Sequence, residues 1–164
     1  MSLITETGIA SADSESLCDV STADTYFSRM GNTTWNALFT SQKEAALRKA
    51  TNYMEQVYKA RWQGLRVNSV QALDWPRMGV TANGYSVLST IVPVPIQRAC
   101  AELALRSLSL ELLPDIGQQK ISAKVGDIEV TYDKASPQQK QYPAIDALLA
   151  PFFQNSAFTH RLER

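Results

Sequence analysis

Residues 41–62 read SQKEAALRKATNYMEQVYKARW, and this segment carries the strongest periodic pattern in the chain. Its apolar side chains recur at steps of three and four residues, which is the spacing of one face of an α-helix. These apolar residues are Ala46, Ala50, Tyr53, Met54, Val57 and Trp62. Ser41 and Glu44 form a capping-box pair at the start, and Gly64 follows the end. The pattern therefore predicts a long central helix over residues 41–62.

Shorter helical patterns lie on both sides of this central segment. They cover residues 21–30, 95–113 and 143–150. Pro95 and Pro143 each stand in a first turn, where the missing N–H group costs nothing, and Pro114 ends the second pattern. We expect these helices to cover the central one.

Two segments favour short β-hairpins. Asn83-Gly84 is a dipeptide typical of tight hairpin turns, although the alternation around it is weak. Residues 120–132 alternate apolar and polar side chains around Gly126-Asp127. The predicted fold class is mostly α: a small bundle of about four helices with one or two short β-hairpins and extended N- and C-terminal arms.

The chain has 164 residues, which is enough for one domain. We expect a small, polar N-terminal arm over residues 1–15 and a helical domain over 16–151. A C-terminal tail follows over 152–164. Its apolar residues are Phe152, Phe153, Phe158 and Leu162. Because they are too apolar for a solvated end, we expect the tail to dock on its own core or on a partner.

Charge is balanced over the whole chain but not along it. The 16 basic and 16 acidic side chains cancel, which argues against nucleic-acid binding through overall basicity and leaves a local basic face open. Residues 1–30 hold five acidic groups and one basic group, whereas residues 31–80 hold three acidic and seven basic. Such opposed patches suit head-to-tail self-association, or they form an ordinary solvated surface.

The sequence offers little catalytic chemistry. The single histidine, His160, lies in the tail, and Cys18 and Cys100 stand far apart with no metal-ligand spacing. No phosphate-loop, dinucleotide, C-x-x-C or H-E-x-x-H motif occurs. No apolar run approaches a membrane span, and the first residues show no signal peptide. We predict no enzyme activity, no catalytic residue, no cofactor, no metal and no membrane contact, with two reduced cysteines in an intracellular protein.

Basic residues on and after the central segment are candidates for contacts with DNA or with a neighbouring subunit. They are Lys43, Arg48, Lys49, Lys59 and Arg66. The aromatic residues Tyr53, Tyr58, Trp62 and Trp75 offer stacking surfaces for bases. Because Tyr53 and Trp62 fall on the apolar side of the helix, core packing is the favoured role for them.

Three local patterns occur together in order: Ala45–Tyr53, the run Gln71-x-Leu73-x-Trp75-Pro76-Arg77, and Val92–Ile96 leading into Ala99–Ala104. Over residues 20–113 this combination resembles the DnaT-like single-stranded-DNA-binding family of phages and prophages. That family is similar in turn to the head–tail connector (adaptor) proteins of tailed phages. The Gln-x-Leu-x-Trp-Pro-Arg run is the most specific element and suggests architecture, with a large aromatic side chain placed against the helices.

The resemblance implies two different functions. As a connector, the chain is a structural virion protein that forms a dodecameric ring between portal and tail around the DNA channel. Its partners are then the portal protein and the tail or tail-completion proteins of the phage, and the C-terminal segment of the chain reaches the portal. It also contacts DNA without sequence preference. It is made in the host cytoplasm and located at the head–tail interface. The alternative is a replication-type protein whose basic helix grips single-stranded DNA. Neutral charge and opposed patches favour the connector.

Overall fold

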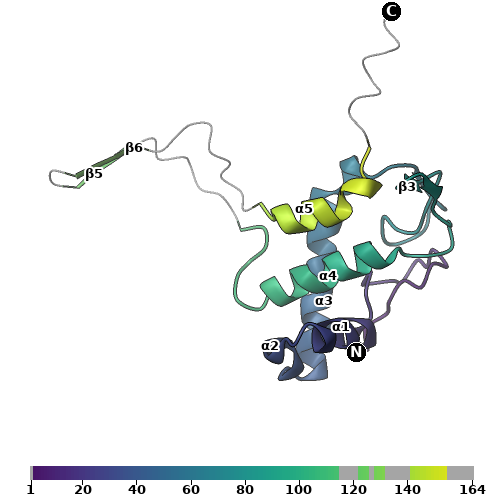
Figure 1. Ribbon diagram of the computed structural model, residues 1–164, viewed down its shortest axis with the longest axis horizontal. Coiled ribbons are helices and arrows are strands. Elements are labelled where there is room, and N and C mark those ends of the chain that lie inside the picture. The colour runs from purple at the N-terminus through teal and green to yellow at the C-terminus, as the bar shows by residue number, and fades with distance from the viewer. Residues whose placement is uncertain (1, 115–121, 126–127, 132–140, 155–164) are drawn as a thin grey trace, which may run out of the picture.

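The computed structural model describes residues 2–114, 122–125, 128–131 and 141–154, and Figure 1 shows a mostly α fold as predicted. The α-helices are α1 (Val20–Arg29), α2 (Thr33–Asn36), α3 (Thr40–Val57), α4 (Val94–Arg106) and α5 (Pro143–Leu149), and the 3-10 turns are η1 (Lys59–Arg61) and η2 (Ala150–Phe152). Four of these helices correspond to the predicted ones. The short helix α2 was not predicted from the sequence.

The strands form three antiparallel pairs. These are β1 (Leu65–Arg66) with β2 (Arg77–Met78), β3 (Thr81–Ala82) with β4 (Tyr85–Ser86), and β5 (Ser122–Val125) with β6 (Ile128–Thr131). Asn83 and Gly84 join β3 to β4 with φ angles of 53° and 84°, as a type I′ turn requires. The two predicted hairpins are confirmed, whereas the β1–β2 pair was not predicted.

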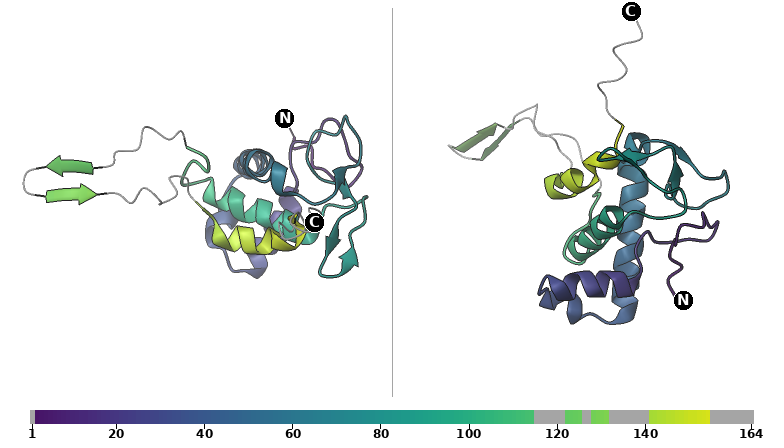
Figure 2. Two further views of the ribbon diagram at one scale, coloured as in Figure 1. Left: turned by 90° about the horizontal axis from the view of Figure 1, so that it is seen from above. Right: turned by 45° about the vertical axis from the view of Figure 1, so that its right-hand side comes forward.

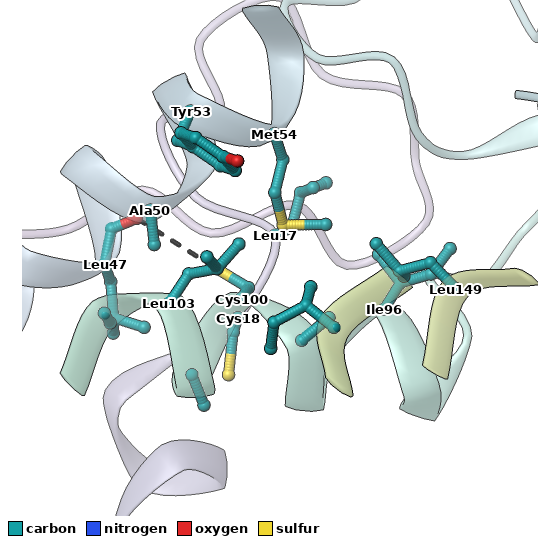
Figure 3. Packing of buried hydrophobic residues seen from close by; sticks show 14 of the residues in the cluster. Leu17, Cys18, Leu47, Ala50, Tyr53, Met54, Ile96, Cys100, Leu103 and Leu149 are labelled. Atoms are coloured by element: carbon teal, nitrogen blue, oxygen red, sulfur yellow. Dashed lines mark hydrogen bonds between the residues drawn. The ribbon is translucent and has the colours of Figure 1, made fainter. Parts of the chain in front are cut away.

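Helix α3 is the centre of the protein, and α4 packs against it. Helices α1 and α5 both pack against α4, so that α4 lies among three helices (Figure 2). Figure 3 shows Leu47, Ala50 and Met54 of α3 directed toward Cys100 and Leu103 of α4. All of these side chains are buried. The apolar face inferred from the sequence of residues 41–62 is therefore the inner face of α3.

Both cysteines are part of this core. Cys100 lies beside α3, with its Sγ atom 3.4 Å from Thr51 Oγ1. Burial raises the pKa of the Cys100 thiol to about 11 and also raises the pKa of Cys18. Both thiols are therefore protonated near neutral pH and act as small apolar side chains.

The ends of three helices differ from the prediction. Helix α1 begins at Val20, one residue before the predicted start, because Asp19 caps it and accepts a hydrogen bond from Thr22 N at 2.8 Å. Helix α3 begins at Thr40, where the Gln42 side chain accepts from Phe39 N at 2.9 Å. Helix α4 ends at Arg106 because the Ser107 hydroxyl bonds back to Ala104 O at 2.8 Å and the chain then turns.

The N-terminal segment, residues 2–18, which includes most of the predicted arm over residues 1–15, is packed against the core. Thr5 and Ser16 form an isolated bridge, and Leu17 and Cys18 are buried. Glu15 Oε2 lies 2.8 Å from Arg48 Nη2 on α3. Glu15 therefore finds its partner within the same chain.

The start of the predicted docking tail also belongs to the core. Phe153 packs against Trp62, with ring centroids 5.1 Å apart, and Phe152 packs edge-on against Trp75 at 5.8 Å. Gln154 N donates to Arg61 O at 2.7 Å. Phe152 and Phe153 are thus buried by their own chain and unavailable to a portal. Phe158 and Leu162 lie outside the described residues.

Candidate nucleic-acid interface

The Gln-x-Leu-x-Trp-Pro-Arg run has a structural role. Trp75 is fully buried, and the Gln71 amide donates to Leu73 O and Pro76 O. The Arg77 guanidinium donates to three backbone carbonyls, those of Gln63, Gly64 and Asp74. These side chains fix the loop that follows α3, and their functional groups are turned inward.

Gly64 lies at the tightest point of this loop. Its φ angle is +66°, and a Cβ atom there would lie 2.1 Å from Met78 O. Only glycine allows β1 to approach β2 so closely.

Two of the five predicted basic contacts are already occupied within the chain. Lys43 is buried, with its Nζ atom 2.9 Å from Asp24 Oδ1. Arg48 Nε donates to Glu15 Oε2 at 3.0 Å. Asp24 and Glu15 of the acidic N-terminal region are therefore paired with Lys43 and Arg48 of the basic central region within one chain. These four side chains do not supply the head-to-tail contact that was one of the two interpretations of the charge pattern.

Lys49 and Lys59 are exposed and Arg66 is half-buried, and within the described residues none of these three cations has a carboxylate at ion-pair distance. Lys49 and Lys59 mark the ends of a line of exposed polar residues: Lys49, Asn52, Gln56 and Lys59, here called the α3 stripe. At 3.6 residues per turn Lys49, Asn52 and Gln56 fall within an arc of about 60° and span about 10 Å along α3, and Lys59 follows in the turn η1 after the helix ends. The Gln56 side chain donates to Asn52 Oδ1 at 2.9 Å, which orders the middle of the stripe.

A groove borders each end of the stripe. Lys49, Asn52 and Gln56 line one side of the first groove, and residues 107–113 line the other, including the carboxylate of Glu111. The second, the 59–69 groove, is lined by Lys59, Leu65, Arg66, Val67, Asn68, Ser69, Asp74 and Arg77. Lys59 and Arg66 thus line the second groove as cations, with the amide of Asn68 and the hydroxyl of Ser69 beside them, whereas the guanidinium of Arg77 is bonded to backbone carbonyls.

Two carboxyl groups are associated with the 59–69 groove: Asp74 lines it, and Glu55 is bonded to the backbone of Asp74. Asp74 N donates to both carboxylate oxygens of Glu55, at 2.9 and 3.0 Å. Burial and the nearby charge of Asp74 raise the pKa of Glu55 from 4.5 to about 7, and burial also raises the pKa of Asp74. Protonation of Glu55 near neutral pH leaves Lys59 and Arg66 less neutralised.

The raised pKa of Glu55 predicts a pH dependence of stability. Because the folded state binds this proton more tightly than the unfolded state, the stabilisation is fully present below about pH 4.5 and is lost as pH rises through about 7. We expect the free energy of unfolding to fall by roughly 1–3 kcal/mol more over this window in the wild type than in Glu55→Gln. Urea denaturation of both proteins from pH 4.5 to 8 measures the difference. Identical pH profiles would contradict the assignment.

The four aromatic residues considered as stacking surfaces are all buried. Tyr53, Tyr58, Trp62 and Trp75 pack in the core, several of them edge to face. Core packing, the favoured role, is confirmed. Among the described aromatic residues, the most exposed are Tyr85 at 79% and Phe39 at 76%. In the sequence, Tyr85 is marked by its position directly after the Asn83-Gly84 turn, a pattern that predicted the hairpin but not an exposed ring.

Together the fold and this surface define a small, mostly α protein with an exposed polar and basic stripe on its central helix. The chain belongs to the family described as "Putative DnaT-like ssDNA binding protein", whose profile matches residues 1–164. The match covers the whole chain and not only residues 20–113, where the resemblance was recognised. No curated protein and no solved structure is similar to the chain at a significant level.

The prediction of a head–tail connector is wrong. The family that matches the chain from end to end is described by single-stranded DNA binding and not by a place in the virion. Two features that had favoured the connector are explained within one chain: Lys43 and Arg48 pair with Asp24 and Glu15, and Phe152 and Phe153 at the start of the tail are buried. The expected location at the head–tail interface rested on the same connector role. In the part of the chain that the structure describes, no helix is long and apolar enough to cross a membrane.

Proposed function

We propose that this protein binds single-stranded DNA without sequence preference, holding the phosphate backbone along the α3 stripe and in the 59–69 groove. The observation that carries the proposal is the placement of Lys49, Lys59 and Arg66. They are the members of the predicted basic set that have no carboxylate partner within the described residues, and they line two grooves, Lys49 the first and Lys59 and Arg66 the second.

This arrangement suits a flexible polyanion. Lysine and arginine attract phosphates and release counterions, which supplies affinity that is independent of sequence. Between the two lysines, the amides of Asn52 and Gln56 provide further hydrogen-bond donors. The net charge of the chain is zero, so attraction comes from this local surface and not from the whole molecule.

Binding rather than catalysis is the proposed role. The two thiols are buried, and their raised pKa values keep them protonated, so neither is available as a nucleophile. Glu55, whose pKa is shifted toward neutrality, lies among structural contacts of the loop.

Charge reversal in the 59–69 groove tests the proposal. We expect the double variant Lys59→Glu, Arg66→Glu to bind fluorescein-labelled oligo(dT) at least about tenfold more weakly in fluorescence anisotropy, because it removes two of three phosphate contacts and adds repulsion. Far-ultraviolet circular dichroism checks that the double variant remains folded.

A matched control lies between α1 and α4. Arg29 and Arg98 are exposed and line a separate groove there. Reversing both to glutamate changes the net charge by the same amount, and we expect the affinity to stay within about twofold of the wild type. Equal losses in the two double variants would show that overall charge, and not the proposed surface, controls binding.

A further inference from the structure

Tyr85 has a solvent-exposed aromatic ring, whereas most of the other aromatic rings in the described residues are buried. It lies in strand β4 with 79% of its surface exposed, whereas Trp35, Trp62 and Trp75 are at most 1% exposed. Its cross-strand neighbour is Ala82, which is too small to cover the ring. The face of this ring is therefore open to a ligand.

The hairpin that carries Tyr85 is held in one conformation. The type I′ turn at Asn83-Gly84 matches the twist of the strands. Val87 N donates to Val80 O at 2.9 Å, which extends the pairing beyond Ser86. A tyrosine presented on an ordered hairpin loses little conformational entropy when it binds.

The hairpin is tied to the segment that carries the groove cations. Thr81 N donates to the side-chain oxygen of Gln63 at 3.2 Å. The amide nitrogen of the same Gln63 side chain donates to Pro151 O and Phe153 O, at 3.0 and 2.9 Å, which fixes its position. In sequence Gln63 lies between Lys59 and Arg66. In Figure 1 the β3–β4 hairpin accordingly lies at the end of the molecule where α3 ends.

From this geometry we propose that Tyr85 stacks on a base of the single-stranded DNA whose phosphates lie in the 59–69 groove. The inference rests on the proposed function and adds to it the residue that contacts bases. Stacking requires only a π-face, which every base has, so the contact is tolerant of sequence. A basic groove and an exposed aromatic ring, here on segments joined through the Gln63 side chain, are the two features that general single-strand binding combines.

Alanine and phenylalanine substitutions separate stacking from hydrogen bonding by the phenol. We expect Tyr85→Ala to weaken binding to oligo(dT) about tenfold, within the range measured for loss of one base–aromatic contact. Tyr85→Phe keeps the ring and is expected to bind within about twofold of the wild type. Phe39→Ala, which removes the other strongly exposed ring from the start of α3, is the control and should leave the affinity unchanged.

A tryptophan at this position reports the contact directly. The three native tryptophans are buried, so Tyr85→Trp adds an indole at an exposed position. We expect oligo(dT) to quench its emission in proportion to binding, and no comparable quenching in the wild type.

The outcomes distinguish this inference from the proposed function. If the wild type binds and the groove variant does not, while Tyr85→Ala binds normally or the new tryptophan is not quenched, the stacking role is overturned and the phosphate surface stands. If the wild type does not bind oligo(dT) at all, both are overturned. Equal thermal midpoints for Tyr85→Ala and the wild type exclude a folding defect as the cause of a loss.

Discussion

Replacing Trp75 with alanine is expected to lower the free energy of unfolding by about 3–5 kcal/mol. The indole is fully buried and packs edge to face against Trp62 at 5.7 Å and Phe152 at 5.8 Å. Removing it leaves a cavity where the loop after α3, the end of α5 and the central helix meet. Because Trp62 and Phe152 cannot both move to fill that space, most of the lost packing is not recovered. Urea denaturation followed by circular dichroism measures the change.

Phe39→Ala is the matched control for Trp75→Ala. Phe39 is also a large aromatic residue, but it is 76% exposed at the start of α3, so its removal is expected to cost less than about 0.5 kcal/mol. A loss below about 1 kcal/mol for Trp75→Ala would place its indole at the surface and contradict the described packing.

Glu6→Ala is expected to destabilise the protein by about 3 kcal/mol, because it removes the acceptor around which the N-terminal segment folds. Glu6 is buried, with 3% of its surface exposed. One of its carboxylate oxygens accepts from Gly8 N and Ala10 N, at 2.7 and 3.0 Å. The other accepts from Ser11 N and the Ser14 hydroxyl, at 2.9 and 3.0 Å. Without the carboxylate, these four donors have no acceptor although most of them are buried, and a buried donor without an acceptor destabilises the folded state.

Two further variants define the role of Glu6. Asp13→Ala removes an exposed carboxylate from the same segment and is expected to have almost no effect. Glu6→Gln preserves the shape of the side chain but replaces one acceptor oxygen with a donor. Its loss in free energy of unfolding should therefore lie between those of Glu6→Ala and Asp13→Ala. Limited proteolysis of residues 2–18 provides a second measure, and unchanged protease resistance in Glu6→Ala would contradict the role given to this side chain.

The main helices could be predicted from sequence because the side chains that a helix buries on one face recur at the helical period, and apolar residues mark them. This holds for α3, where Ala46, Ala50 and Met54 mark the inner face. The exact ends were predicted less well, because they depend on single side chains such as Asp19 and Ser107 that choose between competing hydrogen bonds.

The partners of polar and charged groups could not be predicted from sequence. Lys43 has the spacing of an exposed helical residue, yet it is buried because Asp24, nineteen positions earlier, folds back beside it. In the sequence Glu6 has the appearance of a solvated acidic residue, but in the structure four groups of the same segment donate hydrogen bonds to its carboxylate. For the candidate site, local spacing supplied Lys49, Lys59 and Arg66, and only the tertiary structure separated them from Lys43 and Arg48.

The affinity of the wild-type chain for labelled oligo(dT), measured across a series of salt concentrations, tests single-strand binding most directly. Three phosphate contacts, at about 0.7 per contact on a single strand, predict a slope of about −2 for the logarithm of the association constant against the logarithm of salt concentration. Reversing Lys59 and Arg66 should remove most of this slope. Failure to bind at low salt, or binding that does not change with salt, would contradict a phosphate-binding surface on α3 and the 59–69 groove.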